Sequence, residues 1–250
     1  MLKACKEGRK DIVDLMIKNG CNDFNGGLYG ACRRGHKELV EMMLSLGAND
    51  YDNGLYNACT GGHDELIKMM IDLGTNDYNN GLEGACEGGH KELVDIMISL
   101  GANDYNIGLE SACQGGHVEI VKMMLSLGAT NYNDGLYYAC LGGHIEIVKM
   151  MLSLGAMNYD DGFQNACLRG HKKLVEMMIS LYTDNIDYVK GLYNACRGGN
   201  VEIIKMMLSY TNFYTWGLKG ACEGGHLEIV KWMFELSGNI NVANHNLMVY

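Results

Sequence analysis

The sequence predicts an all-α solenoid built from antiparallel helix pairs that are joined by short return loops. Three observations predict it: cysteines that recur at a fixed interval, a Gly-His step that recurs with them, and apolar residues at helical spacing. Cysteine stands at positions 5, 32, 59, 86, 113, 140 and 167, always 27 residues apart, and then at 196 and 222. A period between about 20 and 50 residues is typical of repeats that stack on their neighbours. Function is therefore expected on a surface and not in a deep pocket.

The first helix of each unit is expected to be short. In residues 55–81, a representative unit, Leu55, Ala58 and Cys59 stand at i, i+3 and i+4 and form one buried stripe. That stripe predicts a helix of about two turns. Gly62 and the glycine before it end the helix, because glycine adopts the left-handed conformation at little cost.

The second helix of the unit is expected to begin at His63. Its apolar face follows the helical spacing from Leu66 to Met70, and Gly74 ends it. Methionines come in pairs in this helix, as at Met69 and Met70. These flexible side chains either fill the core between repeats or, where the first of a pair is exposed, form a binding surface.

The segment between one unit and the next is short and polar. Residues 75–81 (TNDYNNG) are rich in Asn, Asp and Gly, which predicts a return loop. Two short amphipathic helices are not stable alone, so stacking on the next unit must supply the stability. The chain is then one domain, residues 1–250, made of nine repeats. The predicted repeats lie near residues 1–27, 28–54, 55–81, 82–108, 109–135, 136–162, 163–191, 192–217 and 218–246.

Charge and hydropathy exclude several classes of partner. The formal net charge is −10 and the sequence pI is near 5.2. Lys and Arg alternate with Glu and Asp and form no basic stripe, so nucleic acid is not an expected partner. No stretch approaches the roughly 18 to 20 apolar residues that a membrane span needs, and residues 1–20 lack the apolar core of a signal peptide. We therefore expect no membrane partner and a cytoplasmic location.

Cysteine and histidine recur together, as at Cys59 and His63, which raises the question of a zinc site. Tetrahedral zinc needs four convergent ligands, whereas equivalent residues of packed helices lie about 8–10 Å apart. That separation also exceeds the Cα limit of about 7 Å for a disulfide. The cysteines are therefore expected to be buried free thiols, with no metal and no cofactor. No repeat combines a nucleophile, a base and an orienting acid, so no catalytic residue and no enzymatic activity are expected.

One order of small, apolar and Gly-His residues recurs from unit to unit. In one unit this order is formed by Leu82, Ala85, Cys86, Gly89, His90, Leu93, Val94, Met97, Ile98, Gly101 and Ala102. Units with this order resemble ankyrin repeats. The resemblance implies a solenoid of helix pairs that binds proteins through its concave face without catalysis. It also implies that the recurrent histidine hydrogen-bonds the backbone of the turn where a helix begins.

Three features depart from the family pattern. The stretch from Gly74 to Leu82 is shorter than in the family, so short return loops are expected in place of most β-hairpin fingers. The family's T-P-L-H becomes x-G-L-Y, as in residues 53–56, and the chain has no proline, so glycine and Asn or Asp must set the start of the helix. The second alanine is cysteine in every unit. Such units are similar, more weakly, to repeats of giant viruses of amoebae, which implies a viral protein in the host cytoplasm.

The same resemblance places the two residues after each Ala-Cys along the concave groove. The second is usually glycine, which predicts a shallow groove, whereas the first varies between basic, polar, acidic and apolar. Leu141 and Leu168 are the expected anchors, because apolar and Arg side chains often dominate interface energy, and Tyr137 and Tyr138 are secondary candidates. Neutral drift on a solvated surface is the alternative interpretation. The predicted partner-binding residues are Arg33, Arg34, Glu87, Gln114, Tyr137, Tyr138, Leu141, Leu168, Arg169 and Arg197.

Three functions stay open at this point. The first is a noncatalytic scaffold that binds a host protein or a second copy of the chain. The second is a structural protein that self-associates end to end. It is suggested by Met1, which takes the Leu position of the first helix with no polar capping repeat before it, and by residues 246–248, which resemble the opening of a tenth unit. The third is an adaptor that presents substrates to a degradation complex.

Overall fold

The structure is a computed structural model that describes residues 1–182 and 185–247, with side chains through residue 238. It divides into two compact units, Met1–Asn131 and Tyr132–Tyr250, which are described separately below as unit 1 and unit 2. Over the described ranges the secondary structure is helical and contains no strand. The fold class is thus confirmed as an all-α, ankyrin-like solenoid of helix pairs. The extent of the domain and the repeat boundaries stay predictions.

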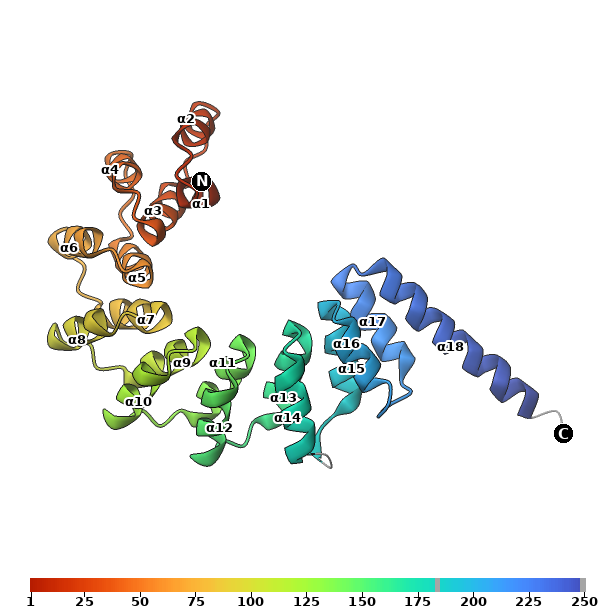
Figure 1. Ribbon diagram of the computed structural model, residues 1–250. Coiled ribbons are helices and arrows are strands. Elements are labelled where there is room, and N and C mark those ends of the chain that lie inside the picture. The colour runs from red at the N-terminus through yellow and green to blue at the C-terminus, as the bar shows by residue number, and fades with distance from the viewer. Residues whose placement is uncertain (183–184, 248–250) are drawn as a thin grey trace. The chain divides into compact units, whose positions relative to one another are not determined.

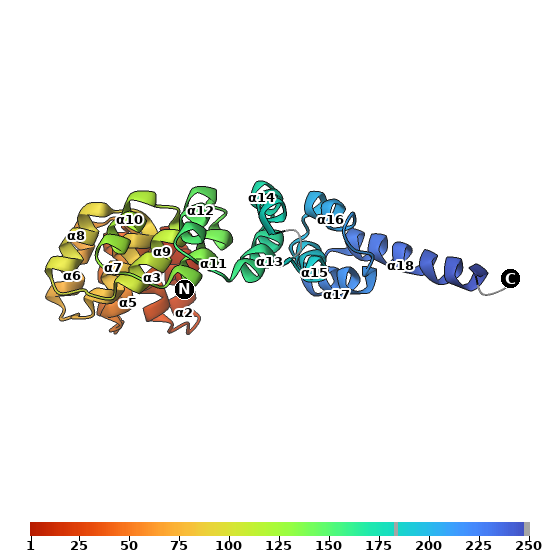
Figure 2. The same ribbon diagram turned by 90° about the horizontal axis from the view of Figure 1, so that it is seen from below.

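Unit 1 is a stack of five helix pairs. From α3 onward, the odd-numbered helices lie on the inner side of the curve and the even-numbered helices on the outer side (Figure 1), and Figure 2 shows the same stack from below. The helices are α1 (Leu2–Lys6), α2 (Lys10–Lys18), α3 (Phe24–Arg34), α4 (Lys37–Ser45), α5 (Tyr51–Gly61), α6 (Asp64–Asp72), α7 (Tyr78–Gly88), α8 (Lys91–Ser99), α9 (Tyr105–Gly115) and α10 (Val118–Ser126).

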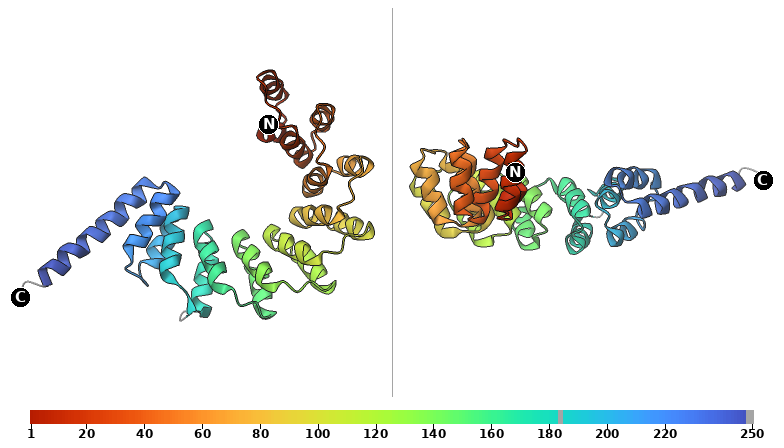
Figure 3. Two further views of the ribbon diagram at one scale, coloured as in Figure 1. Left: turned by 180° about the vertical axis from the view of Figure 1, so that it is seen from behind. Right: turned by 90° about the horizontal axis from the view of Figure 1, so that it is seen from above.

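Unit 2 continues the pattern and ends on a long helix. The view from behind in Figure 3 shows α18 running past its partner α17. Helix α18 is continuous through Leu247, so that residue does not open a separate tenth unit, and Met248 lies outside the described residues. The helices are α11 (Tyr132–Gly142), α12 (Ile145–Ser153), α13 (Tyr159–Arg169), α14 (Lys172–Tyr182), α15 (Tyr188–Gly198), α16 (Val201–Met207), α17 (Tyr214–Gly224) and α18 (Leu227–Leu247).

The first helix of a typical unit is longer than the sequence predicted. Helix α7 begins at Tyr78, so the predicted loop over residues 75–81 is wrong for its last four residues. The Asp77 side chain accepts a hydrogen bond from the amide of Asn80 at 3.2 Å and thereby caps the helix. The Asn- and Asp-rich stretch is therefore a capping sequence as well as a turn. This agrees with the expectation that Asn or Asp, in place of proline, sets the start of the helix.

The ends of both helices follow the prediction. In the representative unit, Gly62 follows the first helix in the left-handed conformation with φ +71°, and Gly74 follows the second with φ +102°. A side chain would be strained at either position. His63 is the N-cap residue of the second helix, as predicted.

The core is formed by the stripes read from the sequence. Leu55, Ala58 and Cys59 are fully buried, and Met70 is buried while Met69 is only half-buried. In all three methionine pairs of unit 1 and all three of unit 2, the second residue packs in the core. All ten cysteines are free thiols, and eight are buried. Burial raises the pKa of Cys59 to about 12, so this thiol stays protonated.

A glycine and a methionine meet inside the helix pair. A Cβ placed on Gly54 would lie 2.6 Å from Sδ of the buried Met70. The Gly54 amide also donates a hydrogen bond to the carbonyl of Asp50 at 3.1 Å, which proline could not do. The change from T-P-L-H to x-G-L-Y therefore makes room for methionine within a helix that starts earlier. Glycine stands at this position before every repeat after the first: Gly27, Gly54, Gly81, Gly108, Gly135, Gly162, Gly191 and Gly217.

The recurrent histidines join one repeat to the one before it. Nε2 of His90 lies 3.2 Å from the carbonyl oxygen of Thr60, and Nε2 of His117 lies 3.0 Å from that of Glu87. The expectation that histidine bonds the turn where a helix begins is wrong, because these carbonyls lie at the carboxyl end of the preceding first helix. Those carbonyls lack helical partners, so an imidazole satisfies them. In unit 2, the Asn200 side chain donates to the carbonyl of Leu168 at 2.9 Å in the same way.

Short return loops are tied down by side chains of the preceding repeat. Oδ1 of Asn79 accepts hydrogen bonds from the amides of Asn103 and Asp104 at 2.9 and 3.0 Å. Oδ1 of Asn106 does the same for Thr130 at 2.8 Å and the next residue. These bonds satisfy loop backbone groups that would otherwise depend on water. They hold the loops in the absence of a finger.

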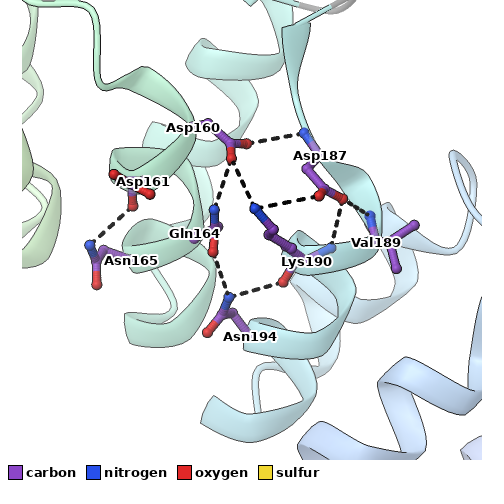
Figure 4. A network of polar contacts seen from close by, with 8 residues as sticks. All are labelled: Asp160, Asp161, Gln164, Asn165, Asp187, Val189, Lys190 and Asn194. Carbon is purple, nitrogen blue, oxygen red and sulfur yellow. Dashed lines mark hydrogen bonds and ion pairs between the residues drawn. The ribbon is translucent and has the colours of Figure 1, made fainter.

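The regular Gly-Ala loop is replaced between α14 and α15, where the connecting stretch is two residues longer and residues 183–184 lie outside the described part. A polar network stands beside this break (Figure 4). Asp160 accepts from the Asp187 amide at 3.1 Å and from Gln164 at 2.9 Å, and the Lys190 ammonium lies 3.8 and 3.7 Å from the two carboxylates. The Tyr159 ring stacks on Tyr182 with centroids 4.4 Å apart. Aromatic packing and this network thus replace the usual Gly-Ala step.

Candidate partner-binding surface

The predicted partner-binding residues lie in the last two turns of the first helices. The repeats present these residues on one face within each unit, because equivalent positions of stacked repeats point the same way. In unit 1 this face carries Arg33 and Arg34 on α3, Glu87 on α7 and Gln114 on α9. In unit 2 it carries Tyr137, Tyr138 and Leu141 on α11, Leu168 and Arg169 on α13, and Arg197 on α15.

Glycine at the second groove position has a packing cause. A Cβ on Gly61 would lie 2.5 Å from the backbone oxygen of Arg33 in the preceding helix and equally close to the His63 ring. Backbone atoms cannot rotate away as a side chain can. Glycine here therefore lets neighbouring first helices approach closely, and it also leaves the surface without a side chain.

Unit 1 contains a hollow where the sequence predicted only a shallow groove. Its volume is about 490 Å³, and it opens on the face formed by α1, α3, α5 and α7. Lys6, Thr60 and His63 were not among the predicted site residues, although Lys6 and Thr60 occupy the first groove position of their repeats. The hollow is lined by Lys6, Arg33, Arg34, Thr60, Gly61, His63, Glu87 and Gly88.

An ion pair spans this hollow across an intervening repeat. Nη2 of Arg33 lies 2.8 Å from Oε1 of Glu87, and the Tyr56 hydroxyl between them donates a hydrogen bond to the same carboxylate. The Arg33 and Glu87 side chains are 32% and 19% exposed, so both are partly withdrawn from water. Burial raises the pKa of Glu87, but hydrogen bonds from Tyr56 and Arg33 outweigh it and lower that pKa overall. Glu87 is thus ionised at neutral pH and held in place.

The other two cations of the hollow have no such partner. Arg34 is exposed and Lys6 is half-buried, and among the described residues neither forms an ion pair with a carboxylate. With Arg33 balanced by Glu87, these two charges give the hollow a positive excess.

Charge changes sign farther along the same face. Glu83 on α7 is half-buried, and burial together with the carboxylates of Glu87 and Glu110 raises its pKa. The Glu110 carboxylate accepts a hydrogen bond from Asn131 at 3.1 Å. Unit 1 is therefore positive near α1 and α3 and negative near α7 and α9.

The face of unit 2 is more apolar. The Tyr137 and Tyr138 rings meet edge to face with centroids 5.2 Å apart, and Tyr137 is 38% exposed. Leu141 and Leu168 are half-buried on α11 and α13, which pack against each other. Nε2 of His171 lies 3.0 Å from the Leu141 carbonyl oxygen, which fixes the backbone beneath that side chain.

An aromatic cluster at the far end of unit 2 was not among the predicted site residues. The Lys219 ammonium lies 5.2 Å from the centroid of the Trp216 ring, and that ring meets Tyr193 edge to face at 6.2 Å. Tyr193 also donates to Glu223, just as Tyr56 does to Glu87 one repeat on. The signal in the sequence was the aromatic run in residues 210–217 together with the Tyr-to-Glu spacing. Phe213 beside it is 56% exposed.

Metal binding and membrane crossing were considered for the described residues. In the part of the chain that the structure describes, no three His, Cys, Asp or Glu side chains lie close enough together to hold a metal ion. The helices of the same ranges include none that is long and apolar enough to cross a membrane.

Two comparisons with known proteins found a similarity. Residues 82–161 match the family model of ankyrin repeats, three copies. Among solved structures, the ankyrin repeat domain of human ASB11 is similar, with 24% identity over 62% of this chain and 82% of that chain and a TM-score of 0.46. A search of curated proteins found no match. Ankyrin repeats indicate a protein–protein interaction scaffold, a class that is generally not enzymatic. The resemblance to giant-virus repeats stays a prediction.

Proposed function

We propose that this protein is a noncatalytic scaffold that binds a partner protein through the face formed by the last turns of its first helices. One observation carries the proposal: the side chains of that face change from repeat to repeat while the backbone beneath them does not. Positions 33, 60, 87 and 114 hold Arg, Thr, Glu and Gln, whereas the Ala-Cys pair before each of them recurs in every repeat. A surface that varies on a constant frame suits selective recognition.

The frame also favours binding energetically. Histidine-to-carbonyl bonds such as that of His117 hold the end of a first helix to the repeat that follows it before any partner arrives. A preorganised surface loses little conformational entropy on association, so more of the contact energy appears as affinity. In unit 2, Leu141 and Leu168 are the proposed anchors, because half-buried apolar side chains beside a firm backbone are desolvated at low cost.

The test is partner capture by the chain immobilised from its natural cell extract, followed by identification of the captured protein and reconstitution with the purified partner. We expect the Leu141→Asp/Leu168→Asp double variant to lose capture while its circular dichroism spectrum is unchanged. The matched control is Leu154→Asp/Leu181→Asp, because these leucines are also apolar and lie exposed at the ends of α12 and α14. Equal capture by both double variants would remove Leu141 and Leu168 from the site, and loss in both would mean a nonspecific effect.

End-to-end self-association is the second proposal, and one observation favours it. Cys222 on α17 is exposed, whereas the equivalent Cys196 on α15 is fully buried. Light scattering across a concentration series measures the mass directly, and a mass that stays monomeric would exclude this function. The role of a degradation adaptor, the viral origin and the cytoplasmic location stay predictions.

A further inference from the structure

The hollow of unit 1 differs from the rest of this acidic chain. The formal net charge of the protein is −10, yet three cationic side chains and one carboxylate line this hollow. The carboxylate is Glu87, and it is already held by Arg33 and Tyr56. Lys6 and Arg34 are left facing solvent without an ionic partner among the described residues.

Helix dipoles alone do not explain these cations. Basic side chains in the last turn of a helix are favoured by the negative end of its dipole, which suits Lys6 on α1 and Arg34 on α3. Helices α5, α7 and α9 have equivalent carboxyl ends but no basic residue there. The helix dipole therefore favours basic residues at these positions without requiring them. It does not by itself account for the cluster of cations that lines the hollow.

We propose that this hollow binds an extended acidic segment of the partner protein, with carboxylates seated against Lys6 and Arg34. The proposal rests on the function proposed above and names the chemistry of the partner. Charge-assisted hydrogen bonds to ammonium and guanidinium groups are stronger than neutral ones, and a partly enclosed hollow screens them less than open solvent does. Gly61 and Gly88 have no side chains, so the bound backbone can lie close to the wall.

The geometry sets the spacing of the carboxylates. Lys6 and Arg34 lie on neighbouring first helices, α1 and α3, and packed helices are about 8–10 Å apart. An extended chain in the polyproline II conformation has three residues per turn and advances about 3.1 Å per residue. Acidic residues three positions apart then lie on one side of the chain, about 9 Å from each other, and reach the two cations together.

The far side of the face limits the length of the acidic stretch. Beyond the hollow stand Glu83 and Glu110, which would repel further carboxylates. A polyanion with a charge on every unit, such as nucleic acid, would extend beyond the hollow and meet that repulsion there. We therefore expect a short acidic motif and not a long acidic tract.

The experiment is an NMR titration of the full ¹⁵N-labelled chain at about 20 mM and about 150 mM salt. The probe is a ten-residue Gly/Ser peptide that carries two glutamates three positions apart, and the control peptide carries glutamine in their place. We expect shifts of the Gly61 and Gly88 amides with the glutamate peptide, weakening with salt, and none with the glutamine peptide.

Two double variants test the residues. Lys6→Gln/Arg34→Gln should weaken peptide binding by about tenfold or more, whereas Lys68→Gln/Lys91→Gln removes the same charge from exposed sites on α6 and α8 and should weaken it less than twofold. Equal losses in the two variants, shifts with the glutamine peptide, or tighter binding of a single-stranded oligonucleotide at the same amides would overturn the proposal. If the peptide fails while the partner is still captured through Leu141 and Leu168, this inference falls and the proposed function stands.

Discussion

Replacing Gly54 with alanine tests the contact that links the two helices of a unit. A new Cβ would lie 2.6 Å from Sδ of Met70, which is about 0.9 Å inside the ordinary contact distance of roughly 3.5 Å. Met70 is fully buried, so its thioether has no open space to enter. Overpacking of this kind costs about 2 kcal/mol.

The substitution also has a favourable part. Alanine is a better helix former than glycine by about 1 kcal/mol, and Gly54 lies inside α5. The net expectation for Gly54→Ala is therefore a loss of about 1 kcal/mol in the free energy of unfolding. Met70→Ala removes Sδ, so the same glycine change in that background should raise stability by about 1 kcal/mol. The double-mutant cycle should then show a coupling of about 2 kcal/mol.

Urea unfolding followed by circular dichroism measures the free energy of unfolding of the unmodified chain, the two single variants and the double variant, and equal m-values make the four comparable. Gly238→Ala is the matched control, because Gly238 lies in helix α18 and a Cβ there would meet nothing within 4 Å. That variant should gain about 1 kcal/mol with or without Met70→Ala. If Gly54→Ala changes the free energy of unfolding with the same sign and size whether residue 70 is Met or Ala, then Gly54 does not serve to make room for Met70.

Three further predictions follow from individual groups. Asp104→Ala loses the hydrogen bond to the Ile107 amide (3.1 Å) and should cost about 1 kcal/mol in thermal unfolding, whereas Asp104→Ser should retain most of the stability. Because burial and neighbouring carboxylates raise the pKa of Glu83, its ionised form destabilises the fold. Glu83→Gln should therefore be more stable at pH 7, with the gain fading as pH falls below the unfolded pKa of about 4.3; a gain that persists at low pH would contradict this. Ellman's reagent should label the exposed Cys222 fast and the half-buried Cys21 more slowly; unchanged fast labelling in Cys222→Ser would refute the assignment.

Where sequence reasoning succeeded, the signal was local. The stripe of Leu55, Ala58 and Cys59 stands on one face of one helix, and Gly62 ends that helix by its own conformational preference. Spacing along a helix and the properties of single residues were sufficient here. The start of α7 was predicted wrongly because the capping Asp77 stands within a stretch whose composition is also that of a loop.

The candidate site was only partly predictable for a different reason. Arg33 and Glu87 were both predicted as site residues, but their pairing joins positions 54 residues apart, which is twice the repeat length. Nothing in the 27-residue pattern shows that a side chain reaches over an intervening repeat. Tyr56 was passed over for the same reason, because its role depends on Glu87 in the next repeat.

Periodicity and residue type were enough to predict the repeat, the buried face of each helix and the free thiols, because periodic apolar residues and glycines act within one repeat. Three features became clear only in the folded chain: His90 bonds the preceding helix, Gly54 makes room for Met70, and Lys6 and Arg34 share a hollow. These are contacts between elements, and their distances follow from how closely and at what rotation neighbouring helices pack. The period alone does not specify that geometry.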